Sequence, residues 1–335
     1  MEHADSPERI VLIRETTGPR LPTWLLDDGH AGNLRQAQAL AHALGIAPQH
    51  HWTLQRRAPW RWAAPRLLPA STQAFGAAFA QALQRPPALA IGCGRQAALA
   101  TRLLRRRGAR VAQILDPRVD PRHWDVVIAP EHDGLRGENV ISLIGSLHPV
   151  DASWLANGRA AFPHLQQLPG PRTALLIGGP SAHFAMDTQA LAHWLDALVA
   201  SVARQGGSLM VTTSRRTPGG VGALLAERLR AVPHARWDGA DANPYAGFLG
   251  WAERIVCTPD SVNMLSEACA TEAPVEVFAP ERVGGRPAQF LEQLMALSRI
   301  RRFAPEQPAW PVTPLRETAR VAALVHQRLS LPTLA

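Results

Sequence analysis

A cluster of polar residues after the apolar run 23–26 combines a carboxylate with glycines and an amide. Its members are Asp28, Gly29, Gly32 and Asn33. Glycines allow the backbone to approach a ligand closely, and a helix that begins here presents unpaired N–H groups to an anion or a sugar hydroxyl. Asp28 is therefore a candidate general base. The alternative is that Asp28 or Asn33 only caps the helix, as short polar residues often do.

Two further clusters, in the second half of the chain, combine glycines, hydroxyls and arginines. Each follows an apolar run, and their members are Gly178, Gly179, Ser181, Thr213, Ser214, Arg215 and Arg216. If the runs are neighbouring parallel strands, these donors converge on one edge of a sheet and suit a diphosphate leaving group. The alternative for the arginines is a solvated basic turn, which the flanking hydroxyls make the weaker interpretation.

Two other groups of residues are candidates for the same chemistry. Ser261, Met264 and Glu267 lie at positions i, i+3 and i+6 of a predicted helix, where the carboxylate can accept both hydroxyls of a ribose. The alternative is an ordinary capped helix with Glu267 in solvent. His132 is a second candidate general base. A lone histidine in a loop, His148 included, is more often only exposed or hydrogen-bonded.

The sequence carries few signals for cofactors or metals. The turn before Arg95 has two glycines and lacks the third glycine of a dinucleotide fingerprint, so we do not expect NAD. Cys93, Cys257 and Cys269 are widely spaced and form no CxxC pair, which argues against a thiolate zinc site and a disulfide framework. No acidic metal cluster is evident. We therefore expect no cofactor and no metal.

Short aliphatic runs alternate with amphipathic stretches, and this alternation predicts the elements that position the clusters. Strands are expected near 23–28, 88–94 and 173–180, with helices at 32–45 and 187–204. Short aliphatic strands are typical of parallel sheets covered on both faces. The predicted fold class is therefore α/β, with two Rossmann-like, doubly wound domains and a ligand cleft between the carboxyl ends of their strands.

The same pattern predicts the domain boundaries. Residues 1–160 are expected to form the N-terminal domain and residues 170–310 the C-terminal domain, separated by a segment rich in Pro, His and Gln. Residues 311–335 contain a helical pattern that is expected to pack back across the junction.

Composition and charge limit the partners. The chain has 335 residues, 46% of them hydrophobic, and a net charge of +8 with arginine as its only basic residue besides histidine. Anionic partners are expected, namely nucleic acid, an anionic membrane or a phosphorylated small molecule. Nucleic acid is disfavoured because the arginines are scattered and no recognition motif is present. No apolar run spans a bilayer and the N-terminus lacks a signal peptide, so we expect a cytoplasmic protein.

One segment departs from the alternating pattern. Residues 58–70 place Trp60 and Trp62 beside Arg61 and Arg66 without a regular period. Indoles beside guanidinium groups suit peripheral contact with the inner face of the cytoplasmic membrane. The alternative, a proline-rich connector whose tryptophans pack on the N-terminal domain, is the somewhat stronger interpretation.

Motifs along residues 22–303, above all TTSRRTP and DSVNMLSEA, resemble the Elm-type family of mitochondrial fission proteins, which is widespread in bacteria. That family is similar to glycosyltransferases of the GT-B type, with two Rossmann-like domains. The resemblance implies a nucleotide-sugar donor in the second domain. It assigns the donor to Gly178, Gly179, Ser181, Thr213, Ser214, Arg215, Arg216, Ser261, Met264 and Glu267. It assigns the acceptor to Asp28, Gly29, Gly32, Asn33 and Arg95.

The combined hypothesis is an inverting, metal-independent transfer of a sugar from a nucleoside-diphosphate sugar to a lipid-linked or polysaccharide acceptor. Arg215 and Arg216 stabilise the departing diphosphate, Glu267 holds the ribose, and Asp28 or His132 deprotonates the acceptor. One alternative is a nucleoside-diphosphate-sugar epimerase on the same fold. Another is a non-catalytic binding protein recruited to a membrane.

Overall fold

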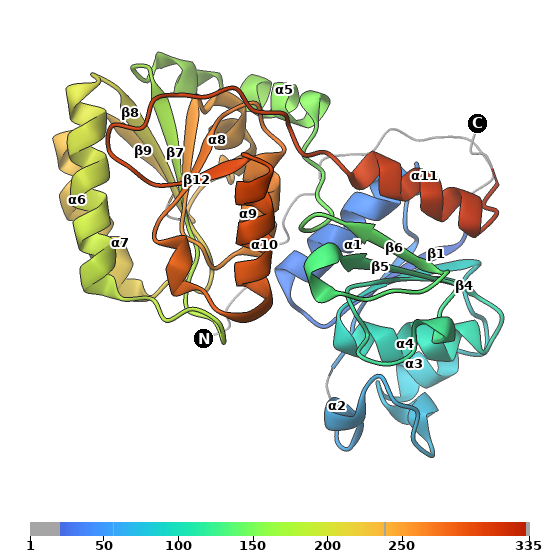
Figure 1. The fold of residues 1–335 in the computed structure, drawn as a ribbon. Helices are drawn as coiled ribbons and strands as arrows, with labels where there is room; N and C mark the ends of the chain where they lie inside the picture. The colour runs from blue at the N-terminus through green and yellow to red at the C-terminus, as the bar shows by residue number, and fades with distance from the viewer. Residues whose placement is uncertain (1–20, 56, 238, 333–335) are drawn as a thin grey trace.

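The computed structural model describes residues 21–332 with the exception of 56 and 238, so the outermost parts of the predicted terminal segments, 1–20 and 333–335, lie outside the described residues. The described chain forms two lobes, each built around a six-stranded parallel sheet with helices on both faces (Figure 1). The predicted α/β fold with two doubly wound domains is confirmed.

The first sheet has the order β2-β1-β3-β4-β5-β6. Its strands are β1 (Thr23–Asp27), β2 (His50–Thr53), β3 (Leu89–Cys93), β4 (Arg110–Ile114), β5 (Val126–Pro130) and β6 (Val140–Leu143). The chain winds outward from β1 in one direction and from β3 in the other. The carboxyl ends of β1 and β3 therefore flank the topological switch point, the place where open α/β sheets bind ligands.

The second sheet has the order β12-β11-β10-β7-β8-β9. Its strands are β7 (Arg172–Ile177), β8 (Ser208–Thr213), β9 (His234–Arg236), β10 (Arg254–Cys257), β11 (Val275–Val277) and β12 (Ile300–Arg302). Here the winding direction reverses between β7 and β10. The loops after these two strands contain Gly178 and Asp260, so the second switch point coincides with one of the polar clusters.

Helices bury both faces of each sheet because the central strands are aliphatic on both sides. In the first domain the helices are α1 (Ala31–Ala43), α2 (Trp60–Ala63), α3 (Ala77–Ala82) and α4 (Arg95–Arg105). In the second they are α6 (Thr188–Arg204), α7 (Gly219–Arg228), α8 (Tyr245–Trp251), α9 (Val262–Cys269) and α10 (Gly285–Ala296). Leu40 and Phe79 represent the two buried clusters of the first domain, and Phe290 and Leu198 those of the second.

The chain crosses between the lobes twice (Figure 1). Helix α5 (Ala152–Ala161) follows the first sheet but packs on α8 of the second domain. Helix α11 (Thr318–Arg328) follows the second sheet but packs on α1, and its Val321 and Val325 lie in a core cluster of the first domain. Each domain is thus completed by a helix from the other side of the junction.

Three strands were not expected from the sequence, namely β2, β9 and β12. All three are at sheet edges and are short and polar, with His50 and His51 in β2 and Arg301 and Arg302 in β12. Edge strands are solvated on one side, so they need no continuous aliphatic run. Within the described residues no helix has the length and apolarity needed to cross a bilayer.

Candidate functional site at the junction of the two domains

The loop after β1 is held by a buried carboxylate. Asp27, the last residue of β1, accepts a hydrogen bond from the Gly29 amide at 2.6 Å and pairs with His51 of β2. The next residue, Asp28, accepts a hydrogen bond from Asn33 Nδ2 at 2.8 Å, and its side chain is 9% exposed. The N-cap residue of α1 is His30, without a side-chain cap. The capping alternative for Asp28 and Asn33 is therefore wrong, and Asn33 instead orients Asp28.

The turn after β3 passes close to the carboxylate of Asp28. A Cβ placed on Gly94 would lie 3.3 Å from Asp28 Oδ2 and 2.5 Å from Asn33 Nδ2, so this turn passes directly over the pair. The side chain of Arg95 points elsewhere. Its Nε donates to the carbonyl of Ala64 at 2.5 Å, and its Nη2 donates to the carbonyl of Trp62. The predicted acceptor contact of Arg95 is replaced by a structural one that holds the segment around α2.

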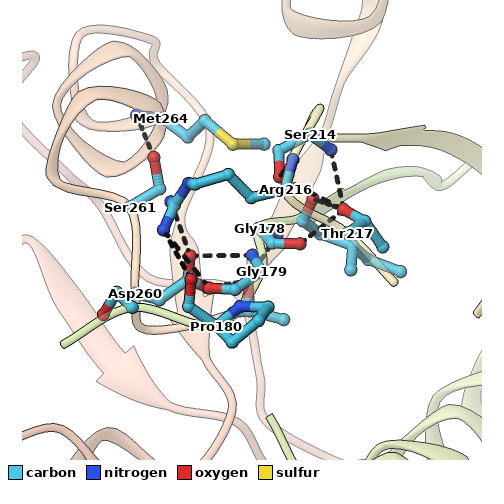
Figure 2. Close-up of polar contacts among 12 residues, drawn as sticks. Gly178, Gly179, Pro180, Ser214, Arg216, Thr217, Asp260, Ser261 and Met264 are labelled. Carbon is cyan, nitrogen blue, oxygen red and sulfur yellow. Dashed lines mark hydrogen bonds and ion pairs between the residues drawn. The ribbon is translucent and has the colours of Figure 1, made fainter. Parts of the chain in front are cut away.

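The second domain builds its switch point around another buried carboxylate, Asp260 (Figure 2). Asp260 Oδ2 accepts hydrogen bonds from the Gly179 amide and from Arg216 Nη2, both at 2.9 Å. Its Oδ1 accepts from the Thr258 hydroxyl at 2.8 Å, and Thr258 accepts from the Gly178 amide at 2.7 Å. The two glycine amides predicted to bind a diphosphate are thus occupied within the protein.

Packing explains why glycine is required at both positions. A Cβ on Gly178 would lie 2.1 Å from Asp260 Oδ2, and a Cβ on Gly179 would lie 2.3 Å from the carbonyl oxygen of Arg216. Contacts this short are not tolerated, so any side chain would push the loops after β7, β8 and β10 apart. Arg216 Nη1 also donates to the Pro180 carbonyl at 3.2 Å. Arg216 therefore joins three loops instead of projecting towards a ligand.

The remaining polar groups of this edge differ in how far they are engaged. Ser214 donates its amide to Thr217 Oγ1 at 3.0 Å, which shapes the turn, and the exposed Ser181 accepts a hydrogen bond from the amide of His183 at 3.2 Å. Thr213 is half-buried at the end of β8. Arg215 is exposed and makes no hydrogen bond or ion pair with any described residue. It is the cation of this loop that is available to an anion.

Helix α7 begins beside these residues without a side-chain cap. It starts at Gly219, directly after Pro218, and a Cβ placed on Gly219 or Gly220 would meet no atom within 4 Å. Unpaired amides and the positive end of a ten-residue helix favour a bound anion. The sequence analysis did not single out these glycines, although the motif TPGG that follows Arg216 is a recognisable helix start.

Helix α9 carries the predicted ribose contacts and also the domain interface. Ser261 caps the helix by accepting from the half-buried Met264 amide at 3.4 Å. Glu267 is 3% exposed, so the alternative with this carboxylate in solvent is wrong. Its Oε1 lies 2.7 Å from Arg35 Nε of α1, and its Oε2 accepts from the Tyr245 hydroxyl at 2.6 Å.

The surroundings of Glu267 perturb two titrating groups. Burial raises the pKa of Glu267, while Arg35 and the hydrogen bond from Tyr245 act in the opposite direction. Burial, followed by the charge of Glu267, raises the pKa of Tyr245 well above its usual value, so the phenol stays a donor. Both oxygens of Glu267 are engaged, and a ribose hydroxyl must compete with Arg35 for one of them. Arg35 and Tyr245 were not singled out from the sequence, because no local pattern shows that they meet Glu267.

The two switch points meet directly. A Cβ on Gly32 would lie 2.1 Å from Asn263 Nδ2, and Gln36 Nε2 donates to Asn263 Oδ1 at 3.4 Å. The start of α1 therefore lies against the start of α9. Asn33 follows Gly32, and Asn263 lies on the first turn after Asp260. Across this contact, Asp28 with its partner Asn33 approaches the second-domain loops that contain Arg215, Arg216 and Asp260.

His132 lies at a second contact between the domains, on the 3-10 turn η3 (Glu131–Asp133). Its ring packs on Phe290 of α10 with 5.4 Å between centroids, and burial lowers its pKa. Arg286 of α10 donates to Asp133 at 2.8 Å beside it. Asp28 follows β1 and His132 follows β5, and the ends of these two strands are three strand spacings apart, about 14 Å. Asp28 and His132 cannot act on the same hydroxyl group.

A cavity of about 450 Å³ lies away from both switch points. It is at the opposite edge of the second sheet, where Pro171, Arg254 and Trp310 are among its lining residues. Its wall includes the buried ion pair between Arg254 and Glu276, with 2.7 Å between Nε and Oε1. None of the predicted site residues lines this cavity, so the junction remains the candidate site.

Comparisons with known proteins agree with this architecture and name the family. The sequence profile of Mitochondrial fission ELM1 matches residues 31–329, so the chain belongs to this family, as its resemblance predicted. A relative is the Mitochondrial fission protein ELM1 of Arabidopsis thaliana, 28% identical over an alignment of 275 residues that covers 73% of this chain. The match spans 64% of the length of that relative.

Solved structures are similar to this chain at low sequence identity. The UDP-GlcNAc 2-epimerase from Methanocaldococcus jannaschii is 12% identical, with a TM-score of 0.52 over 91% of this chain and 99% of its own. MurG of Acinetobacter baumannii is 15% identical, with a TM-score of 0.48 over 93% of this chain and 92% of its own. At 12% identity the likeness to the epimerase concerns the fold alone, and this fold is the predicted pair of Rossmann-like domains of the GT-B kind.

Proposed function

We propose that this protein transfers a sugar from a nucleoside-diphosphate sugar to a hydroxyl group of a lipid-linked or polysaccharide acceptor, with inversion at the anomeric carbon. The supporting observation is the contact between the two switch points. It brings Asp28, oriented by Asn33, towards the second-domain edge that contains Arg215 and the open start of α7. A carboxylate base and a site for a departing anion are the two requirements of a direct displacement.

The residues divide the reaction between the domains. Asp28 takes the proton of the acceptor hydroxyl as its oxygen bonds to the anomeric carbon. The bond from that carbon to the diphosphate oxygen breaks in the same step, and the electron pair leaves with the diphosphate. Arg215 and the amides at the start of α7 neutralise the negative charge that develops there, so the proposed reaction uses no metal ion or cofactor.

The nucleoside lies, in this proposal, against α9. Glu267 accepts hydrogen bonds from ribose hydroxyls, and Met264 lies one helical turn before it on the same face. Arg35 holds Glu267 Oε1 in the described structure, so donor binding exchanges this charge-assisted hydrogen bond for one from a hydroxyl. We place the reaction at the inner face of the cytoplasmic membrane, where a lipid-linked acceptor is accessible to the first domain.

The positions of the candidate bases make an epimerase the weaker proposal. Epimerisation through proton removal and return requires acid–base groups on both faces of one sugar. Asp28 and His132 follow strands whose ends are about 14 Å apart, and His132 packs on Phe290 in the domain interface. Incorporation of deuterium from heavy water into the sugar, without transfer to an acceptor, would nevertheless decide for the epimerase.

The first experiment is thermal unfolding of the protein with a panel of nucleoside diphosphates and their sugars. A ligand present at about 100 times its dissociation constant adds about 2.7 kcal/mol to the free energy of unfolding. We expect one nucleobase to be selected, and the shift to be strongly reduced in Arg215→Ala and also reduced in Glu267→Gln. Arg230→Ala changes an exposed arginine of the same domain and is the matched control. No shift with any nucleotide would favour the non-catalytic binding protein.

A further inference from the structure

The positive charge of the chain is concentrated in one continuous segment. Residues 29–115 contain twelve of the 35 basic residues, all arginine, and not one of the 27 aspartates and glutamates. The rest of the chain therefore has more acidic than basic residues, and the net charge of +8 originates entirely from this segment. This concentration corrects the expectation that the arginines are scattered.

The segment runs from just before α1 to the residue after β4, and its helices pack on both faces of the first sheet. Its helix α2 lies at the far end of this lobe, beyond α3 and α4 (Figure 1). Arg57, Arg61 and Arg66 are exposed around α2, and no described residue forms an ion pair with any of them. Arg85, Arg106, Arg107 and Arg110 are also exposed on the same domain.

An exposed indole lies beside the arginines of the α2 segment. Trp62 is 60% exposed, and the described chain has only one other large hydrophobic residue that is classed as exposed, Leu297 of the second domain. The Arg61 guanidinium stacks over the Trp62 ring at 4.0 Å from its centroid. An aromatic ring beside cations is suited to the boundary between lipid headgroups and acyl chains.

Hydrogen bonds from two arginines and the packing of one tryptophan hold the backbone around α2 in place. Arg95 donates to the carbonyls of Trp62 and Ala64, and Arg102 Nη1 donates to that of Pro65 at 3.1 Å. Trp60 packs against the core cluster that contains Phe79 and Leu99. Two arginines and one tryptophan thus hold the backbone of the segment, whereas Arg57, Arg61, Arg66 and Trp62 are exposed.

We propose that residues 57–66 form the contact of this protein with an anionic lipid bilayer. Trp62 enters the interface, and Arg57, Arg61 and Arg66 bind phosphate headgroups. The surface is a protruding turn, which reaches a flat membrane, whereas proteins that bind single-stranded nucleic acid hold it in a groove. The contact requires neither nucleotide nor acceptor, so it can be tested separately from the proposed activity.

The site and the proposed membrane contact share one structural support. Gly94 lies against Asp28 and Asn33, and the next residue, Arg95, holds the carbonyls of the α2 segment. Membrane contact through Trp62 therefore positions the switch point of the first domain close to the lipid surface. A hydroxyl group carried on a lipid would then be presented to the Asp28 side of the junction.

The test is co-sedimentation of the full chain with vesicles of phosphatidylcholine, with and without phosphatidylglycerol. We expect binding only with the anionic lipid, decreasing as salt is raised because screening shortens the range of exposed charges. Replacement of Arg57, Arg61 and Arg66 by Glu together should weaken partitioning at least about a hundredfold, and Trp62→Ser about fivefold. Arg230→Glu and Leu297→Ser, exposed residues of the second domain, are the matched controls and should bind as the wild type does.

Unfolding temperatures of all variants establish that they are folded before binding is compared. Equal binding to both vesicle types, equal binding by wild type and the triple variant, or no binding at all would each overturn the proposal. Binding of single-stranded RNA that the triple variant loses, without any vesicle binding, would identify the surface as a nucleic-acid contact instead.

Discussion

The two switch-point loops are built alike but leave opposite charges at the junction. In the first domain, buried Asp27 holds the Gly29 amide and pairs with His51. In the second, buried Asp260 holds the Gly179 amide and pairs with Arg216. Each aspartate thereby fixes a loop that would otherwise leave an amide unsatisfied.

The difference lies in the residue adjacent to each ion pair. Asp28 follows Asp27 and adds a carboxylate held by Asn33, whereas Arg215 precedes Arg216 and adds an exposed guanidinium. Asp27 and Arg216 hold their loops, whereas Asp28 is bonded to Asn33 and Arg215 is exposed. In the proposed reaction this difference lets the first domain accept a proton and the second bind an anion.

The largest expected effect comes from the base of the first domain. Asp28→Asn keeps the size of the side chain and its contact with Asn33 but removes the proton acceptor, so turnover should fall by about 10²–10⁴-fold. Nucleotide-induced stabilisation should be unchanged, since the donor binds the other domain. Rates of sugar transfer from the selected nucleotide sugar measure this. Full activity in Asp28→Asn, with loss in His132→Gln, would assign the base to His132 instead.

The free energy of unfolding of the chain should decrease in acid because of His148. Burial, followed by the charge of Arg35, lowers the pKa of His148 to about 4. A depressed folded-state pKa contributes stability above pH 6.5, the ordinary value, and this stability is lost as the pH falls to about 4. The loss is about 3 kcal/mol.

Urea unfolding between pH 7 and pH 4 measures that loss. His148→Gln cannot be protonated, so its free energy of unfolding should depend less on pH over this range than that of the wild type. The backbone contacts of His148 with Thr318 do not involve the ring and should persist in the variant. If the free energy of unfolding depends on pH to the same extent in both proteins, His148 is not responsible for the loss of stability in acid.

The adjacent arginines of the second domain should separate into a ligand contact and a structural residue. Arg215→Ala removes an unpaired cation, so it should weaken nucleoside diphosphate binding about tenfold to a hundredfold with an unchanged unfolding temperature. Arg216→Ala removes the partner of Asp260 and should lower stability by about 1 kcal/mol as well. Calorimetric titration and thermal unfolding of both variants measure the difference, and identical behaviour of the two would contradict the comparison.

The smallest expected effect concerns the contact between α1 and α9. Arg35→Ala releases Glu267 Oε1, so nucleoside affinity should rise about fivefold because a ribose hydroxyl no longer competes with a charge-assisted hydrogen bond. Tyr245→Phe, which releases the other oxygen, is the companion variant. A decrease of affinity in Arg35→Ala would show that Arg35 itself contacts the nucleotide.

Much of the fold could be predicted because the buried strands have a distinctive composition. The predicted strand at 23–28 and the predicted helix at 187–204 agree with β1 and α6 to within one residue at each end. The polar edge strands β2, β9 and β12 were missed because pairing with a neighbouring strand, and not their own composition, makes them strands.

The positions of the candidate residues were predicted more successfully than their contacts. Residues after strands were correctly expected at the carboxyl edges, because parallel strands all end on the same side of a sheet. The sequence could not show that the amides of Gly178 and Gly179 are already bonded, or that Arg95 supports the α2 segment. These contacts join residues that are 31 to 81 positions apart.

The sequence by itself determined the two doubly wound domains and the loops on which chemistry could take place, because aliphatic periodicity and glycine position act locally. Only the tertiary structure decided which member of each like-charged pair holds the loop, namely Asp27 and Arg216. Arg35 meets Glu267 because α1 and α9 pack together across the domain contact. Such a pairing depends on where whole elements lie relative to one another, and no local pattern of residues encodes it.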